Sequence, residues 1–338
     1  MTETRTDAVA TRLAQTRELL ARRGLPAVFL ETRRNFAWLT AGGSNHVVTG
    51  SETGVAGILV TSGDAIVVTS RIERDRIETE ETGYLGWDIE AVDWWLDDGA
   101  YGAARARSGG EVARDADVES DLVALRSRLS PLDQERLVEL GGVAGRAVEE
   151  ALANIAPGTT EHDLAARLTG MLPAARTPVV LVAADDRIRR FRHPIPTDTT
   201  IRSRVMLVLV AERWGLNAAV TRFREWDSLP DELQQRCEAV SQVERAMHEA
   251  TAPGATLGDV ITAAQAAYAR AGHPDAWQEH HQGGTIAYQG RERVATPDDA
   301  THIEAGMAFA WNPSIAGAKL EDTFILGEDG SRRIVTAR

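Results

Sequence analysis

The sequence predicts an α/β protein of the α+β kind, built from two domains over residues 1–120 and 121–338. Its 338 residues are the length of two ordinary domains. Strand and helix signals alternate in residues 1–110, whereas the second half repeats the order helix, helix, strands. Between them, residues 103–117 are rich in Ala, Arg and Gly, a composition typical of a linker.

The elements of the first domain follow from the spacing of its apolar residues. Apolar residues at helical spacing predict a helix over 9–23, which Gly24 ends. A charged amphipathic pattern predicts a second helix over 71–81. Short apolar runs bounded by turn residues predict strands, and the last two of them a hairpin. These runs are 27–30, 36–40, 55–61 and 65–69.

The second domain contains two predicted helix pairs, each interrupted by an Ala-Pro-Gly triplet. The predicted helices cover 131–153, 160–172, 229–252 and 257–271. Apolar runs between the pairs predict strands at 179–183, 205–210 and 218–223. Residues 280–326 predict further strands and loops. The repeated order indicates an internal duplication.

Composition narrows the function classes. Lys plus Arg number 37 and Asp plus Glu 50, so the net charge is −13, which argues against nucleic acid as a partner. Cys237 is the only cysteine, which excludes an intrachain disulfide and a Cys-based zinc site. Residues 1–22 lack the apolar core of a signal peptide, and the apolar run 205–211 is far shorter than the ~20 residues of a membrane helix. We therefore expect a cytoplasmic protein with no membrane partner.

Four segments of the second domain occur in an order typical of one known family. They are Gly215–Arg222, His280–Gly284, Trp311–Pro313 and Lys319–Thr323. They resemble the patterns Gly-Tyr-x-x-Asp-x-Thr-Arg, Gly-His-Gly-x-Gly, Glu-Pro and Glu-Asp-Thr, and residues 10–100 resemble a creatinase-type N-terminal domain. The chain thus resembles the creatinase/prolidase/aminopeptidase P family. That resemblance implies a C-terminal pita-bread domain preceded by a smaller α/β domain.

Metal-dependent members of this family hold two divalent ions with a set of Asp, Asp, His, Glu and Glu. Transferred to this sequence, the five positions become Ala211, Ala219, His281, Asn312 and Glu321. A methyl group cannot bind a cation, and two retained ligands cannot satisfy two ions. Glu212 could substitute only after a register shift, which would turn its side chain to the other face. The resemblance therefore implies no dinuclear centre, and we expect no metal cofactor.

Creatinase and ectoine hydrolase share the pita-bread fold and hydrolyse C–N bonds without a metal. The catalytic histidine of creatinase precedes the first ligand strand, where this sequence has His193. An imidazole pKa near neutrality suits a group that activates water and then protonates the leaving nitrogen. The predicted catalytic residues are His193, His281 and Glu321, whose carboxylate could hold a cationic nitrogen or orient a histidine. The neighbouring His280 is expected to have a structural or supporting role.

Other polar residues near these positions are predicted to bind the substrate. They are Arg192, Arg222, Tyr288, Arg291 and Asn312. An Arg guanidinium can grip a carboxylate with two parallel hydrogen bonds. Arg222 could instead pair with an acid such as Glu225. N-terminal domains of creatinase-like dimers reach the partner's pocket, so the resemblance implies a homodimer in which Trp38, Asn45 or His46 could make that contact.

Three functions remain open. The first is a metal-independent hydrolase, or a related C–N bond-processing enzyme, acting by histidine acid–base catalysis on a small amino-acid-like or amidine-like molecule. The second is an Xaa-Pro aminopeptidase or dipeptidase with one weakly bound metal on His281, Glu321 and either Asn312 or Glu212. The third is a non-catalytic binding protein. Two histidines, a glutamate and several arginines on one pocket favour chemistry.

Overall fold

The computed structural model describes residues 3–337 and confirms the mixed α/β class. The chain forms two compact units, Met1–Arg126 with Ser130–Leu132, and Ser127–Leu129 with Asp133–Arg338. The domain boundary predicted at residue 120 falls inside helix α5 (Glu119–Ser127). None of the described helices has the length and apolar character needed to cross a bilayer.

The first unit is built on a five-stranded sheet in the order β4-β3-β2-β1-β5. Its strands are β1 (Ala27–Thr32), β2 (Thr53–Thr61), β3 (Ala65–Ser70), β4 (Asp88–Val92) and β5 (Ala113–Arg114). Its helices are α1 (Arg5–Arg23), α2 (Arg33–Leu39), α3 (Arg74–Arg76) and α4 (Gly99–Ser108), with a π-helical turn at Ile77–Thr82. The predicted hairpin is present, since β2 and β3 pair antiparallel. Phe29 and Leu59 of the sheet pack with Ala104 of α4 in the core.

Three segments of this unit differ from the prediction. Residues 36–40, predicted as a strand, lie in and just after α2, because Phe36 and Leu39 are spaced for one helical turn and both are fully buried. Residues 103–117, predicted as a linker, contain much of α4 and all of β5, because their alanines favour a helix that Gly109 ends in the left-handed conformation. The helix predicted over 71–81 is only the short α3 and the π-helical turn.

The second unit contains a three-stranded antiparallel sheet, β6-β7-β8, and a five-stranded antiparallel sheet, β10-β9-β11-β14-β15. The first holds β6 (Arg176–Ala184), β7 (Arg204–Arg213) and β8 (Leu216–Glu225). The second holds β9 (Gly283–Thr285), β10 (Arg293–Val294), β11 (Ala308–Trp311), β14 (Asp322–Leu326) and β15 (Arg332–Ile334). A separate ribbon pairs β12 (Ser314–Ile315) with β13 (Ala318–Lys319).

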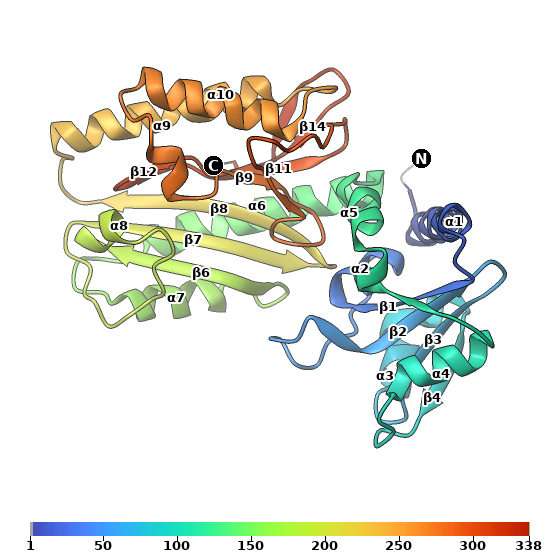
Figure 1. Ribbon diagram of the computed structural model, residues 1–338. Coiled ribbons are helices and arrows are strands. Elements are labelled where there is room, and N and C mark those ends of the chain that lie inside the picture. The colour runs from blue at the N-terminus through green and yellow to red at the C-terminus, as the bar shows by residue number, and fades with distance from the viewer. Residues whose placement is uncertain (1–2, 338) are drawn as a thin grey trace. The chain divides into compact units, whose positions relative to one another are not determined.

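The helices of the second unit match the predicted pairs. They are α6 (Pro131–Ala153), α7 (Glu161–Gly170), α9 (Asp231–Ala250) and α10 (Leu257–Arg270), together with the short α8 (Asp186–Arg190) and the 3-10 turn Ala276–Glu279. Figure 1 shows α9 and α10 along one flank of the strands and α7 along the opposite flank. Apolar side chains of α9 and α10 form one core with β11 and β14, including Phe309, Trp311 and Phe324.

The two larger sheets of the second unit meet where β8 lies beside β14. The amide of Thr221 donates to the carbonyl of Glu321 (3.0 Å), and the amide of Ala219 donates to Thr323 Oγ1 (2.8 Å). These bonds place the middle of β8 directly against the residue that precedes β14. The site described next is built around that junction.

Candidate active site

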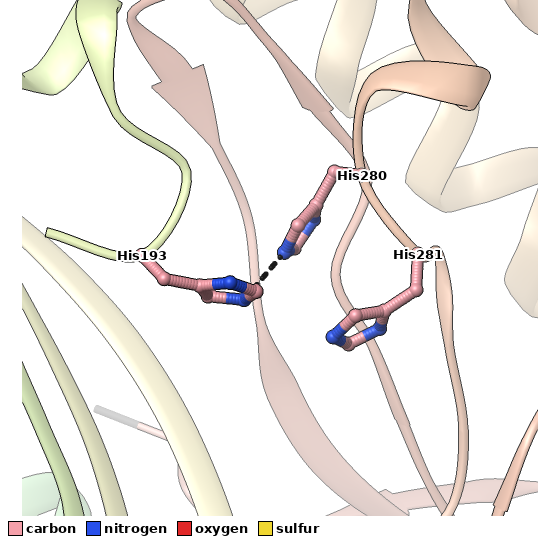
Figure 2. Close-up of side chains that lie close together, drawn as sticks. All are labelled: His193, His280 and His281. Atoms are coloured by element: carbon pink, nitrogen blue, oxygen red, sulfur yellow. Dashed lines mark hydrogen bonds between the residues drawn. The ribbon is translucent and has the colours of Figure 1, made fainter.

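Three histidines gather at one point of the second unit (Figure 2). His193 lies in the segment between α8 and β7, and His280 and His281 lie just before β9. The Nε2 atoms of His193 and His280 are 3.0 Å apart. The ring centroids are 4.5 to 5.8 Å apart, and one ring nitrogen of each histidine lies within 4.8 Å of the others. Segments separated by almost ninety residues thus meet in one imidazole cluster.

The glycines after His281 position this cluster. Gly283 has a φ of 97°, and a Cβ on it would lie 2.2 Å from the carbonyl oxygen of Ala310. A Cβ on Gly284 would lie 1.9 Å from the carbonyl oxygen of Arg293. Only glycine therefore lets β9 pass between β10 and β11, and that passage fixes the two preceding histidines.

Glu321 is the buried carboxylate of the site, with an exposed fraction of 2%. Its Oε2 accepts from Thr221 Oγ1 (2.7 Å) and from Lys319 Nζ (2.9 Å), and its Oε1 accepts from Arg291 (2.6 Å). Burial alone would raise the pKa of Glu321, but the charges of Lys319 and Arg291 and these hydrogen bonds outweigh it and hold the pKa well below its usual range. The carboxylate is therefore ionised at neutral pH.

All three imidazoles are neutral near pH 7. Burial, then the positive charge of Lys319, lowers the pKa of His280 to about 3. Burial, then the charge of Arg291, lowers the pKa of His281 to about 4. The pKa of His193 is lowered by the same causes, burial first and Lys319 second. A neutral imidazole has a free lone pair, so each ring is a proton acceptor or a ligand rather than a cation.

The register of β7 and β8 corrects one predicted position. Val210 pairs with Ala219, and Val208 pairs with Thr221. Paired residues share a face of the sheet and successive residues alternate, so Ala211 faces away from Ala219. The assignment of Ala211 to a ligand position beside Ala219 was therefore wrong. Among the described residues, the face of β7 and β8 that includes Ala219 has no unpaired carboxylate. It carries two acids, of which Glu212 is bound by Arg176 and Glu225 by Arg204.

Asn312 and Arg291, both predicted from the sequence, lie at Glu321. Trp311 pairs with Asp322, so the next position in the same register sets Asn312 across from Glu321. The Oδ1 atom of Asn312 is buried and accepts no hydrogen bond from the described residues. Arg192 pairs with Glu279 and borders a small hollow beside His280. The predicted residues His193, His281, Glu321, Arg291, Asn312 and Arg192 thus belong to one region.

Two residues predicted to bind the substrate have other partners. Arg222 donates to Asp322 (2.7 Å), to Glu149 of α6 (2.9 Å) and to the carbonyl of Thr336 (2.8 Å). Because Thr221 faces Glu321, the next side chain on the strand must face the helices instead. Tyr288 donates to Asp133 near the start of α6 (2.7 Å). These contacts indicate structural roles for both.

Sequence reasoning missed Lys319 and underrated His280. Lys319 is the only lysine in a chain with 36 arginines, and this count was a signal available from the sequence. Its contact with Glu321 needed the structure, because Leu320 and Glu321 lie outside any regular element, between the end of β13 and the start of β14. His280, expected to be supporting, is hydrogen-bonded to His193 itself.

Comparison with known proteins identifies the family of this chain. A model of metallopeptidase family M24 matches residues 135–328, more than half of the chain. The chain belongs to metallopeptidase family M24. The probable dipeptidase PepE of Mycobacterium tuberculosis is 24% identical over 310 residues, covering 81% of each chain. The family confirms the predicted resemblance to the prolidase group and the pita-bread domain.

Several solved structures superpose over nearly the whole chain. The dipeptidase PepE from Mycobacterium ulcerans has a TM-score of 0.80 at 21% identity, covering 98% of this chain and 96% of that one. The prolidase from Pyrococcus horikoshii OT3 has a TM-score of 0.80 at 18% identity, covering 97% and 98%. The N-terminal domain of the FACT subunit SPT16 from Cicer arietinum has a TM-score of 0.74 at 15% identity, covering 98% and 96%. These likenesses show a shared fold.

The residues present do not fit the two-metal centre that the family name implies. Apolar side chains occupy the face of β7 and β8 beside Ala219, and an amide stands at Asn312. Both oxygens of Glu321 already face cations, Lys319 and Arg291. Hard divalent ions need several oxygen ligands, and one paired carboxylate does not supply them. The site instead contains an ionised carboxylate, two cationic side chains and three neutral imidazoles. The three imidazoles together could hold a single ion.

Proposed function

We propose that this chain hydrolyses a C–N bond in a small amino-acid-like or amidine-like molecule, with histidine acid–base chemistry in place of a metal centre. The observation that supports this is the pairing of Glu321 with Lys319 and Arg291 beside three neutral imidazoles. An ammonium and a guanidinium provide positive charge where other family members use ions. A neutral imidazole provides the base.

His193 is the proposed general base. Its neutral ring accepts a proton from a water molecule while the water oxygen bonds to the substrate carbon. The imidazolium then donates that proton to the leaving nitrogen as the C–N bond breaks, so the hydroxyl stays on carbon and the amine leaves neutral. His280, 3.0 Å away, orients the ring or shares its proton. Asn312 Oδ1, which lacks a donor among the described residues, can accept an N–H of the substrate.

Metal analysis and a substrate screen with chelator test this proposal. We expect the purified protein to carry less than stoichiometric manganese, cobalt, zinc or iron. We expect C–N hydrolysis of a small-molecule panel to persist in excess chelator, with a chelator-treated prolidase as the control that loses activity. Hydrolysis that disappears with chelator and returns with a divalent ion would reject the metal-independent mechanism.

A second candidate is an Xaa-Pro dipeptidase or aminopeptidase with a single metal ion. Two observations favour it. The three imidazoles could together hold one ion, and similar proteins are named dipeptidase and prolidase. Such an ion would depend mainly on the imidazoles, because both oxygens of Glu321 already face cations. Cleavage of Xaa-Pro peptides only after addition of manganese, cobalt or zinc would establish this candidate over the first.

Assembly and location remain proposals. We propose a cytoplasmic homodimer, which the family resemblance supports, and light scattering of the purified chain measures the assembly. A third candidate, a non-catalytic binding protein, has support in the likeness to a domain of the FACT subunit SPT16. That candidate predicts that replacing His193 and His281 together leaves every measurable phenotype unchanged.

A further inference from the structure

Lys319 stands apart from every other cationic side chain of this protein. The chain has 36 arginines and one lysine, so arginine supplies positive charge almost everywhere. The two side chains are not equivalent, because an ammonium is compact and points three donors from one atom, whereas a guanidinium is a wide planar fork. The single lysine lies in the proposed active site, where it contacts Glu321.

The surroundings of Lys319 leave part of its hydrogen-bonding capacity unused. Its side chain is 7% exposed, and the described residues give it one partner, Glu321 Oε2, at 2.9 Å. An ammonium carries three N–H donors, and leaving donors unpaired in a buried place costs free energy. Glu321 also pairs with Arg291, so these three side chains together carry one positive charge in excess. A bound anion would balance both the charge and the donors.

A small hollow with a mixed apolar and polar lining adjoins Lys319. Its volume is about 10 Å³, and Lys319, His280, Arg192, Phe191 and Ser314 are among the residues that border it. Ser314 Oγ and His280 Nδ1 are buried and have no hydrogen-bond partner among the described residues. A hollow of this size holds about one water-sized atom. It therefore has room for a single oxygen, and Lys319, Ser314 and His280 are the lining residues that can donate a hydrogen bond to it.

We propose that Lys319, with Ser314 and His280, binds one oxygen of the substrate's carboxylate, so that the substrate is an anionic amino-acid-like molecule. The hollow has room for one oxygen of a carboxylate and is too small to enclose a tetrahedral phosphate. This subsite lies next to His280, whose Nε2 is 3.0 Å from His193, so the bound carboxylate would hold the rest of the substrate near the proposed base. The assignment of a substrate rests on the proposed function, whereas anion binding at Lys319 does not.

The single lysine allows a direct measurement on the intact chain. Selective ¹³C-lysine labelling puts one lysine in the NMR spectrum, and that signal belongs to Lys319. We expect acetate to shift it in a saturable way and acetamide, which is isosteric and neutral, to leave it unchanged. Inorganic phosphate is the third probe, and we expect little response. Histidine ring signals serve as a second reporter in variants that lack the lysine.

Variants then locate the site. Lys319→Met should weaken acetate binding, followed at the histidine signals, about tenfold or more, the loss expected for a hydrogen bond to a charged group. Arg189→Met, which removes an exposed cation elsewhere in the same unit, should leave acetate binding unchanged. If Lys319→Met does not fold, Ser314→Ala provides the test, with weaker acetate binding expected.

Three outcomes overturn the proposal. They are no saturable shift with acetate, an equal shift with acetamide, and an equal response to phosphate, which would indicate a general anion site instead of a carboxylate site. No turnover is measured in these titrations, so acetate binding in a protein without hydrolase activity would refute the proposed function and leave the anion subsite standing. Hydrolysis without acetate binding would support the proposed function and refute the anion subsite.

Discussion

At the scale of single residues, burial and two cations set the chemistry of the site. His193 and His280 face each other through Nε2 atoms 3.0 Å apart, and both have a lowered pKa. Two neutral rings in this arrangement share one proton between the facing nitrogens, because one must donate and the other accept. When His193 takes up a proton, a hydrogen bond to His280 can stabilise the resulting imidazolium. This arrangement suits a base that later returns the proton.

Replacement of His193 tests that role. His193→Ala should lower kcat/KM about 10²- to 10⁴-fold, the usual range for a general base, on a substrate found in the chelator screen. His302 is an exposed histidine outside the three-histidine cluster, so His302→Ala should have no effect and serves as the control. Because burial and Lys319 lower the pKa of His193 from 6.5, kcat/KM should rise with pH around a midpoint below 6.5 and then stay level through pH 7. A midpoint above 6.5 in wild type would contradict the assignment.

Glu321 provides a test that uses stability instead of activity. Glu321→Gln should reduce the free energy of unfolding by about 3–5 kcal/mol at pH 7, because it leaves Lys319 and Arg291 beside a neutral group. The pKa of Glu321 is lowered on folding, so its contribution is complete above its ordinary value of 4.5 and is lost as the pH falls below that value.

Urea unfolding at neutral and acidic pH measures this contribution. The difference between wild type and Glu321→Gln should shrink as the pH falls. A variant as stable as wild type at pH 7 would show that the carboxylate is not held by the two cations.

At the scale of elements, one face of β8 contributes side chains to the candidate active site, and the other face packs against α6. Thr221 bonds to Glu321, whereas Arg222 bonds to Asp322 and to Glu149 of α6. The alternation of a strand makes this division unavoidable, since neighbours on one strand point to opposite faces. Arg222 is therefore better explained as a link between β8, β14 and α6 than as a substrate ligand.

Helix α9 carries a carboxyl group that should make stability depend on pH. Burial, followed by the charge of Asp322 and opposed by Arg222, raises the pKa of Glu244 from 4.5 to about 7. A carboxyl whose pKa is raised on folding stabilises fully below 4.5, and this contribution is lost as the pH rises through 7. Glu244→Gln should therefore match wild type at pH 5 and be more stable at pH 8 by about 1–3 kcal/mol.

Thermal and urea unfolding at the two pH values check this expectation. Glu249→Gln, on the last turn of the same helix, is the control for removing a negative charge from α9. An equal effect of both variants at pH 8 would attribute the gain to general charge repulsion and not to burial of Glu244.

At the scale of the whole molecule, an acidic protein contains a cationic site. The net charge is −13, whereas Glu321 in the site faces Lys319 and Arg291. A surface of this sign keeps the protein soluble and repels polyanions at long range, and salt screens that repulsion over about 10 Å. The positive charges of Lys319 and Arg291 are largely buried, with side chains 7% and 15% exposed, so an extended polyanion cannot reach both of them.

Nucleic-acid binding is the corresponding test. Fluorescence anisotropy with a labelled DNA duplex should show no binding at low salt, where electrostatic attraction would be strongest. The same experiment with a basic DNA-binding protein is the control for a responsive probe. A saturable rise in anisotropy that weakens as salt is added would contradict the expectation, and would strengthen the candidate function of a non-catalytic binding protein.

The amino-acid sequence by itself determined the family and the α/β class, and it identified Ala219 and Asn312 as residues that stand where the family pattern has metal-binding carboxylates. Motif order and residue identity suffice for these, because neither a methyl group nor an amide supplies a carboxylate oxygen in any conformation. Tertiary structure decided which side chains meet. It turned Ala211 and Arg222 to the opposite face of the sheet from Ala219 and Thr221. It also brought Lys319 to Glu321 and His280 to His193. The reason is physical: a one-residue difference in register reverses a side chain, and burial among distant segments sets its pKa.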